Sequence, residues 1–444
     1  MKIALVAMSG IRAFNPDLTR LGMTLPGFVE RGKAIASLPS LSLLTLAALT
    51  PERHEVSYHE VEDVRELGQL PPCDVAAIST YTAQAEDAYQ LADRFRAEGA
   101  TTVIGGLHVT SEPQEALEHC DVVVVGEGEP VWPSVLDDLE RGAPDRLYDA
   151  RGRGFDLREA PIPRFELLDP SRYNRLTVQT TRGCPWRCEF CASSILLTRR
   201  FKTKPPERVV AEIRAIKEIW PRPFVEFADD NTFVDRSWSR RLMQQIAPEG
   251  VRWFTETDVA VADDPELLSM MHEAGCAEVL IGFESPSVSG LEGIELRRNW
   301  KARQIDMYER AVEVIQSHGI AVNACFVLGL DGDGPGVFEA VQDFVDRTGP
   351  FDVQITVQTP LPGTPLYERL LGDGRLLHPG AWSRCTLFDV NFRPAKMTVE
   401  QLERGLIELG TRLYSDEATR RRRAAFLDQW RRGRRGRGEN EGVA

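Results

Sequence analysis

Apolar residues along this chain alternate between short runs and longer segments of helical spacing. In the first 150 residues the short runs predict strands, and the segments between them predict helices. The predicted strands are Lys2–Met8, Glu55–Val61, Asp74–Ser79, Thr101–Ile104 and Asp121–Val125, and the predicted helices are Pro39–Leu49, Ala83–Ala97 and about Val131–Leu139. Because strands and helices alternate at this interval, we expect an α/β domain over residues 1–146, with a parallel sheet covered on both faces.

The same alternation returns over residues 172–377. Its predicted strands are Leu176–Thr180, Phe224–Ala228, Arg252–Thr255, Glu278–Phe283, Ala321–Leu328 and Asp352–Val357. The predicted helices between them are about Pro206–Ile219, Ser237–Ile246, Pro265–Ala274, Ala302–His318 and Gly336–Arg347. These repeats are too few to close an eight-stranded barrel. Residues 147–171 are rich in Arg, Gly and Pro and predict a linker between the two domains.

The pattern weakens in a C-terminal extension over residues 378–444. One helix is predicted at Thr398–Tyr414, with Thr398 as its N-cap. Nine arginines then fall within residues 420–437. We expect a solvated helix and a frayed end there. The alternative is a site for an anionic partner, either nucleic acid or lipid.

Composition narrows the class of protein. The 444 residues carry a net charge of −14, which argues against stable nucleic-acid binding. No apolar run is long enough to cross a membrane. Eight cysteines in a chain of this length do not indicate a disulfide framework, so we expect a cytoplasmic protein in a reducing environment. Cys276, Cys325 and Cys385 are predicted to be small buried hydrophobic residues.

Three of the cysteines lie close together, at Cys184, Cys188 and Cys191, with the spacing C-x3-C-x2-C. Thiolates are soft ligands that suit zinc, copper(I) or iron–sulfur clusters. Closed sites usually have four protein ligands, whereas three cysteines suit a cubane cluster with one iron left open. The alternatives are a zinc site with a distant fourth ligand and thiols that lie together by coincidence.

This spacing, with Phe190 just before the last cysteine, resembles the signature of radical S-adenosylmethionine (radical SAM) enzymes. The resemblance covers about residues 172–375 and implies an open, partial (β/α)6 barrel. It implies a [4Fe-4S] cluster on the three cysteines and SAM on the open iron. An electron from a carrier such as flavodoxin or ferredoxin would then cleave SAM to a 5′-deoxyadenosyl radical.

Acidic residues end three predicted barrel strands. Asp229 and Asp230, in the segment Ala228-Asp229-Asp230-Asn231, match the family position that meets the SAM amino group, and a carboxylate can hydrogen-bond an amine there. Glu284 resembles the family's strand-four glutamate, and Glu256 ends the strand before it. The alternatives are an Asx turn for the first segment and a surface carboxylate for Glu284.

Loops at the strand ends of the first domain are rich in glycine, which lets the backbone approach a ligand closely. These loops contain Ser9-Gly10, Thr80-Tyr81-Thr82, Gly105-Gly106, His108 and Gly126-Glu127-Gly128. Each glycine alone is explained by a tight turn. As a set the loops resemble the cobalamin-binding domain of one radical SAM group, a flavodoxin- or Rossmann-like fold.

No histidine of this chain lies in the D-x-H-x-x-G motif that holds cobalt in many cobalamin proteins. His108 follows Gly-Gly-Leu, so we expect it to lie near the ligand or to be structural, without binding cobalt. A domain that no longer binds cobalamin is the alternative.

Together the two resemblances imply a cobalamin-dependent radical SAM enzyme that methylates an unactivated carbon of a small molecule, lipid or peptide. A cyclase or rearrangement enzyme with the same cofactors is one alternative. An RNA methylthiotransferase is another, although the N-terminal region offers only Cys73 and Cys120 for the additional cluster of that class. A non-enzymatic zinc or ligand-binding protein is the third.

Overall fold

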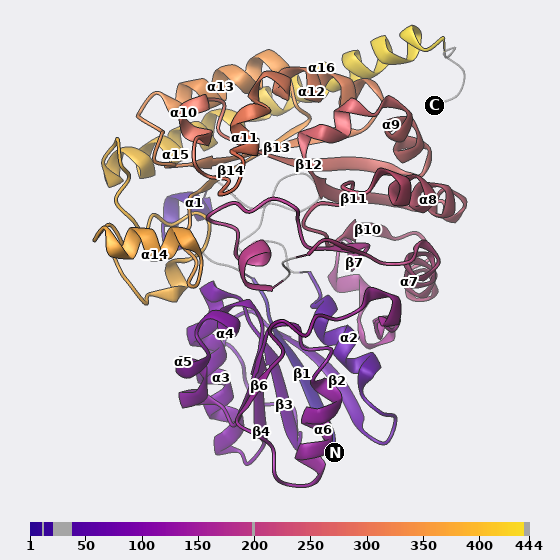
Figure 1. The fold of residues 1–444 in the computed structure, drawn as a ribbon, viewed down its shortest axis with the longest axis vertical. Helices are drawn as coiled ribbons and strands as arrows, with labels where there is room; N and C mark the ends of the chain where they lie inside the picture. Colours follow the sequence, from indigo (N-terminus) through magenta and orange to yellow (C-terminus); the bar gives the residue numbers. More distant parts are fainter. Residues whose placement is uncertain (11–12, 21–37, 198–199, 439–444) are drawn as a thin grey trace.

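A computed structural model describes residues 1–10, 13–20, 38–197 and 200–438. Two α/β units stack along the long axis of the molecule, and the C-terminal helices cover the outer side of the second unit (Figure 1). The first domain is a flavodoxin-like sheet and the second is an open, partial barrel, as predicted.

The first sheet is parallel throughout, in the order β2-β1-β3-β4-β5-β6. Its strands are β1 (Lys2–Met8), β2 (Glu55–Val61), β3 (Val75–Ser79), β4 (Thr101–Gly105), β5 (Val122–Val125) and β6 (Leu147–Asp149). The five predicted strands are confirmed. The sixth strand corrects the predicted linker, because residues 147–149 pair with β5 and belong to the first sheet.

Helices cover both faces of this sheet, since alternate residues of β1 enter different cores. Ile3 and Leu5 pack in the cluster with Leu43 of α2 and Trp132 of α6. Ala4 and Val6 belong to the cluster that contains Leu91 of α3. The helices on these faces are α2 (Leu41–Leu49), α3 (Ala85–Ala97), α4 (Leu107–Ser111), α5 (Pro113–His119) and α6 (Trp132–Glu140). The short helix α1 (Pro16–Arg20) lies apart from the sheet, beside the C-terminal extension (Figure 1).

The second sheet is also parallel, in the order β14-β13-β12-β11-β10-β7. Its strands are β7 (Leu176–Val178), β10 (Phe224–Phe227), β11 (Arg252–Thr257), β12 (Cys276–Glu284), β13 (Ala321–Leu328) and β14 (Asp352–Val357). Its larger helices are α7 (Pro206–Ile219), α8 (Arg236–Ile246), α9 (Pro265–Glu273), α12 (Tyr308–Ser317) and α13 (Val337–Thr348).

All six predicted barrel strands are confirmed, and one predicted helix is divided. The segment predicted as Ala302–His318 forms α11 (Trp300–Arg303), a 3₁₀ turn at Ile305–Met307 and then α12. A shorter helix, α10 (Val288–Leu291), lies between β12 and α11. The cysteine segment follows the short strand β8 (Thr181–Arg182). After it, β9 (Lys202–Thr203) pairs with β8 in the antiparallel direction.

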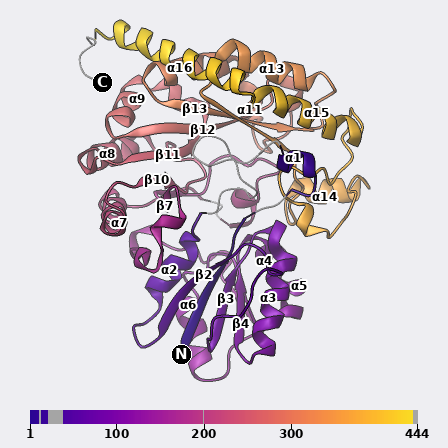
Figure 2. The same cartoon turned by 180° about the vertical axis from the view of Figure 1, so that it is seen from behind.

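The C-terminal extension contains α14 (Pro365–Gly372), α15 (Val399–Leu413) and α16 (Asp416–Gly436). Thr398 forms a capping box with Gln401, which confirms the predicted N-cap. The arginine-rich segment is helical as far as Gly436 and lies along the outer side of the barrel (Figure 2), while residues 439–444 of the predicted extension lie outside the described residues. Arg422 is an exception to the predicted solvation, because it is buried and donates to the carbonyl of Leu413 at 2.6 Å. Within the described ranges, no helix combines the length and the apolar character that a membrane span requires.

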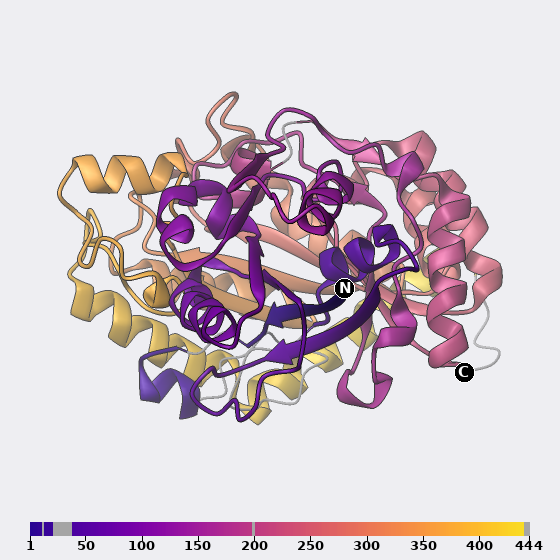
Figure 3. The ribbon, with the colours of Figure 1, turned by 90° about the horizontal axis from the view of Figure 1, so that it is seen from below.

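The carboxyl ends of the first sheet's strands point toward the barrel, as the views from the side and from below show (Figures 1 and 3). Hydrogen bonds also join the N-terminal part of the chain to the C-terminal extension. The backbone N–H of Phe14 donates to Asp389 at 2.9 Å, and Trp382 Nε1 donates to Glu115 at 2.9 Å. The loops that carry the predicted site residues therefore meet between the two sheets.

A glycine in the loop after β13 tests how closely that loop packs against α10. A Cβ at Gly332 would lie 1.6 Å from the backbone oxygen of Ser289, whereas a Cβ at Gly334 would meet nothing within 4 Å. We expect Gly332→Ala to lower the free energy of unfolding by at least about 2 kcal/mol, because backbone must move. Gly334→Ala should change it by less than about 0.5 kcal/mol. Denaturant unfolding of both variants measures the difference, and equal stability would contradict the described packing.

Candidate functional site

The segment Cys184–Cys191 crosses the mouth of the barrel and is fixed on both sides. Asp230 accepts from the backbone N–H of Gly183 at 2.8 Å and from the hydroxyl of Ser193. On the other side, Glu189 N–H donates to the carbonyl of Ile294 at 2.8 Å. The cysteine loop is therefore held at its beginning, middle and end.

The three cysteines line one cavity of about 230 Å³ at the barrel mouth. Acidic and polar residues from the carboxyl ends of the barrel strands line it with them, including Asp230, Asn231, Glu256, Asp258, Gly282, Glu284 and Cys325. Cys325 therefore faces the cavity, which corrects its prediction as a simple core residue. Cys276 and Cys385 are buried as predicted.

The chemistry of the three thiols suits an iron–sulfur cluster. All eight cysteines are unpaired. Cys184, Cys188 and Cys191 line one cavity together. The thiolates that hold a cubane each bind a different iron around a common body, so three cysteines around one cavity fit the predicted [4Fe-4S] cluster.

The surroundings keep these thiols protonated until metal displaces the protons. Burial raises the pKa of Cys184 to about 12, and it also raises the pKa values of Cys188 and Cys191. A thiol must be deprotonated to bind iron, so cluster binding releases protons here.

Asp229 and Asp230 are neighbours in sequence but differ in role. The carboxylate of Asp229 accepts from the backbone N–H groups of Thr180 and Thr181, both at 2.8 Å, and from Thr232 at 2.8 Å. It is 5% exposed and does not line the cavity. Its bonds to Thr180, Thr181 and Thr232 give it a positioning role, and its predicted contact with SAM stays a prediction. Asp230 does line the cavity.

Glu284 is held in an unusual conformation at the end of β12. Its φ of 63° lies in the left-handed region, which a non-glycine residue rarely adopts. Its carboxylate accepts from Lys301 Nζ at 2.7 Å, and Lys301 also donates to the carbonyl of Gly282 at 2.6 Å. Although burial lowers the pKa of Lys301, the nearby Glu284 raises it further, so the net shift is upward. A buried ion pair therefore faces the cavity beside Cys188.

Glu256 projects into the cavity from β11. Burial, followed by the carboxylates of Glu226 and Asp230, raises its pKa to about 8. The side chain is also exposed to solvent, so burial and the neighbouring carboxylates favour its neutral form without fixing it. Its predicted contact with a cofactor stays a prediction.

In the first domain, several predicted residues lie together at the carboxyl ends of β1, β3, β4 and β5. Gly106 has a φ of 121°, and a Cβ there would lie 2.5 Å from the carbonyl oxygen of Thr80. Ser9 is buried, and its hydroxyl lacks a hydrogen-bond partner within the described ranges. Gly10, Gly105, Gly126 and Gly128 end neighbouring strands or follow them closely, and Thr82 begins a 3₁₀ turn.

Tyr81 projects from the end of β3 into the space between the two units. Its side chain is 59% exposed, although protein surrounds it. Burial, followed by the carboxylate of Glu226 on β10, raises its pKa. Small residues, a free buried hydroxyl and one projecting aromatic ring make a face that fits a large flat cofactor such as cobalamin.

His108 does not belong to that face. It is 0% exposed and packs edge-on against Trp382, with ring centroids 5.1 Å apart. Its Nε2 lies 3.5 Å from Glu115, which also accepts from Trp382. These contacts favour the structural role that was also considered, and its contact with a cofactor stays a prediction.

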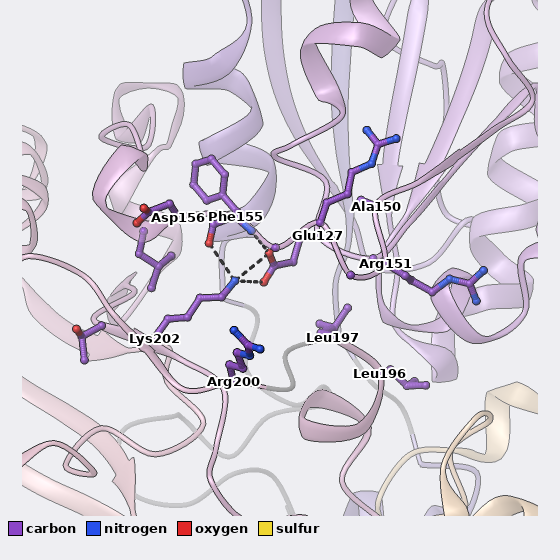
Figure 4. A pocket seen from close by; sticks show the side chains of 15 residues that line it. Glu127, Ala150, Arg151, Phe155, Asp156, Leu196, Leu197, Arg200 and Lys202 are labelled. Atoms are coloured by element: carbon purple, nitrogen blue, oxygen red, sulfur yellow. Dashed lines mark hydrogen bonds and ion pairs between the residues drawn. The ribbon is translucent and has the colours of Figure 1, made fainter.

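Glu127 connects the two units, and its predicted contact with a cofactor stays a prediction. Its carboxylate lies 3.3 Å from Arg182 and 3.2 Å from Lys202, and it accepts from the N–H of Phe155. Figure 4 shows Glu127 and Lys202 pointing toward each other at the edge of a hollow of about 800 Å³. Arg182 also pairs with Glu129 at 2.7 Å, directly before the cysteine loop.

Sequence reasoning missed several residues of the cavity. Asp258 accepts from Trp186 Nε1 at 3.0 Å and from Asn231 Nδ2 at 2.8 Å. Its place just after β11 could have indicated it. No local signal marks Lys301, or Trp300, which stacks on Trp186 with centroids 4.2 Å apart.

Comparisons with known families match the two units separately. The sequence model of the radical SAM superfamily matches residues 178–345, and that of the B12 binding domain matches residues 32–136. A domain of unknown function (DUF4070) matches residues 364–442.

Characterised relatives align with most of the chain. It is 29% identical over 393 residues to a bacteriochlorophyllide d C-12(1)-methyltransferase of Chlorobaculum tepidum, covering 87% of this chain and 84% of the relative. It is 27% identical over 359 residues to a hopanoid C-2 methylase of Rhodopseudomonas palustris, covering 77% and 66%.

The fold has a solved counterpart of full length. It is similar to the radical SAM methyltransferase TsrM of Kitasatospora setae, a structure with cobalamin and a [4Fe-4S] cluster bound. The TM-score is 0.66 at 14% identity, covering 98% of this chain and 99% of the other. This likeness confirms the predicted architecture of two α/β units and a helical C-terminus.

The role of Asp230 can be tested through cluster assembly. We expect Asp230→Ala to weaken cluster binding by about 10- to 100-fold, because the cysteine loop loses its anchors at Gly183 and Ser193. Iron and sulfide content and the cluster absorbance after reconstitution measure this loss. Glu292→Ala, at an exposed position outside the cavity, is the control. Full iron content in the Asp230 variant would contradict the role.

Proposed function

Since the chain belongs to the cobalamin-binding radical SAM family, we propose that it transfers a methyl group to an unactivated carbon of its substrate. The observation that carries the proposal is the convergence of Cys184, Cys188 and Cys191 on one cavity beside Glu284 and Lys301. That cavity is lined by residues at the carboxyl ends of the barrel strands. The segment that follows β8 runs between the barrel and the first domain (Figure 1).

The cysteines would hold the cluster, and the strand ends around Gly106 and Tyr81 would hold cobalamin. When bound, these groups supply the electron that cleaves SAM and the methyl group that is transferred. The protein supplies placement and the exclusion of water.

The cavity offers complementary charges for the amino-acid end of SAM. Lys301 would bind the carboxylate of SAM. The carboxylates of Glu284 and Asp230 would accept hydrogen bonds from the ammonium group of SAM. Because Lys301 is buried and already paired, it is held in place before SAM arrives. Trp186 and Trp300 form a stacked wall that would limit the entry of water.

The proposed substrate is a small molecule, lipid or peptide. The named activities of the relatives concern a chlorophyll-type pigment and hopanoids, which supports an organic substrate of moderate size. An electron carrier of the flavodoxin or ferredoxin type would supply the electron. A cytoplasmic location stays a prediction that the eight unpaired cysteines support.

The proposal is tested by loading the protein without oxygen. We expect the protein reconstituted with iron, sulfide and hydroxocobalamin to form 5′-deoxyadenosine from SAM when a strong reductant is added. The variant Cys184→Ala, Cys188→Ala, Cys191→Ala should form none, because the cluster has no ligands. Cys276→Ala, at a buried position outside the cavity, should retain the reaction and is the control.

The outcomes separate the remaining alternatives. A substrate product without the mass of an added methyl group would favour cyclisation or rearrangement. Zinc without iron or sulfide would overturn the proposal in favour of a binding protein.

Tyr81 tests the cobalamin half of the proposal. We expect Tyr81→Ala to weaken cobalamin binding by about tenfold or more, because a central aromatic contact is removed. Cobalamin content per chain after gel filtration, read from absorbance, measures the effect. Leu427→Ala, at a similarly exposed position on α16, should leave it unchanged. Unaltered content in the Tyr81 variant would place cobalamin elsewhere.

A further inference from the structure

A segment outside the catalytic cavity lies directly against the cysteine loop. Residues 294–296 run antiparallel to residues 187–189, with a bridge between Cys188 and Glu295. Leu296 N–H donates to the carbonyl of Arg187 at 2.9 Å. The surface of this segment is therefore separated from Cys188 by little more than one peptide group.

One buried carboxylate fixes the shape of this segment. Glu295 is 3% exposed and accepts from the backbone N–H groups of Arg187, Arg297, Arg298 and Trp300, at 2.8 to 3.4 Å. Burial favours the neutral acid, but these donors outweigh it and hold the pKa below its usual range. The loop is therefore rigid and locked to the cysteine segment.

The outer side of this loop is cationic in an acidic protein. Residues 296–303, LRRNWKAR, contain no acidic side chain, while the whole chain carries −14. Arg297, Arg298 and Arg303 are exposed, whereas Lys301 is buried in the cavity. Within the described ranges neither Arg297 nor Arg298 has an ion-pair partner. Arg187 lies beside them and is half-buried. We call Arg187, Leu296, Arg297 and Arg298 the cationic patch.

The patch combines charge with apolar area. Leu296 is 47% exposed at its centre. Arginine and apolar side chains together are typical of protein interfaces, and small interfaces are typical of electron-transfer complexes. A local positive patch on a chain of net charge −14 orients an acidic partner as it approaches.

We infer that the cationic patch is the docking site of an acidic one-electron carrier protein of the flavodoxin or ferredoxin type. The inference rests on the proposed function, which requires one electron for each SAM that is cleaved. Electron transfer weakens steeply with distance, so the carrier must dock where the cluster ligands approach the surface. On docking, the reduced carrier would give one electron to the cluster that Cys184, Cys188 and Cys191 would hold.

Direct binding gives the first test. We expect oxidised flavodoxin to bind the reconstituted protein at low ionic strength, with an affinity that falls as salt is added. In the double variant Arg297→Glu, Arg298→Glu the dissociation constant should rise about tenfold or more, because like charges then face each other. Titration calorimetry measures both. The variant Arg297→Lys, Arg298→Lys keeps the charge and should bind within about threefold of the wild type.

A matched control lies on α16, away from the cysteine loop (Figure 1). Arg431 and Arg435 are exposed, and reversing both changes the net charge by the same amount. The variant Arg431→Glu, Arg435→Glu should bind flavodoxin within about threefold of the wild type, because distant charges are screened. An equal loss in both double variants would show that only net charge matters and would overturn the inference.

Formation of 5′-deoxyadenosine separates this inference from the proposed function. With photoreduced deazariboflavin, a neutral small reductant, the Arg297/Arg298 double variant should match the wild type. With reduced flavodoxin it should be slower by about tenfold or more. If the double variant forms 5′-deoxyadenosine more slowly than the wild type with both reductants, or with neither, the docking site is overturned but the proposed function is not. No product from the wild type with deazariboflavin would overturn the proposed function itself. Patch-dependent binding to anionic phospholipid vesicles, without binding to flavodoxin, would identify a lipid surface instead.

Discussion

Two adjacent carboxylates at the end of β10 fix the cysteine loop, and the geometry of the site depends on them. Asp229 holds the backbone of Thr180 and Thr181, where the loop begins. Asp230 holds Gly183 and Ser193 on either side of the three cysteines. Without these bonds, eight residues with three ligands would have to be ordered by the cluster alone, against the conformational entropy of a free loop.

The same loop is tied to the first domain by charge. Arg182 stands between the threonines and the first cysteine, and it pairs with Glu127 and Glu129 from the loop after β5. These three side chains are largely buried, so screening by salt is weak and their geometry is well defined. Arg182 thus fixes the position of the cysteine loop relative to the strand ends that are proposed to hold cobalamin. The proposed chemistry requires the two reactive groups to lie in one enclosed space.

The alternation of apolar runs predicted the barrel well, because its strands are buried on both sides and bounded by clear turns. The acids at strand ends were also found, since parallel strands collect their carboxyl ends at one edge. The sequence could not show that Asp229 and Asp230 differ in role, because the local backbone conformation decides which of two adjacent carboxylates faces the cavity. It missed β6, which is only three residues long, and Lys301, whose partner Glu284 lies in another element. His108 and Glu127 lie in loops suitable for a cofactor contact, but in the structure they contact residues distant in sequence. His108 packs against Trp382, and Glu127 pairs with Lys202.

The bonds between Phe14 and Asp389 and between Glu115 and Trp382 join positions separated by 375 and 267 residues. Such contacts raise the mean sequence separation of the fold, which slows folding. During synthesis the first domain emerges long before the segment that completes its surface. Its face around His108 must therefore wait, uncovered by Trp382, until that tryptophan has been synthesised and has left the ribosome. A segment that is made late thus completes the packing of one that is made early.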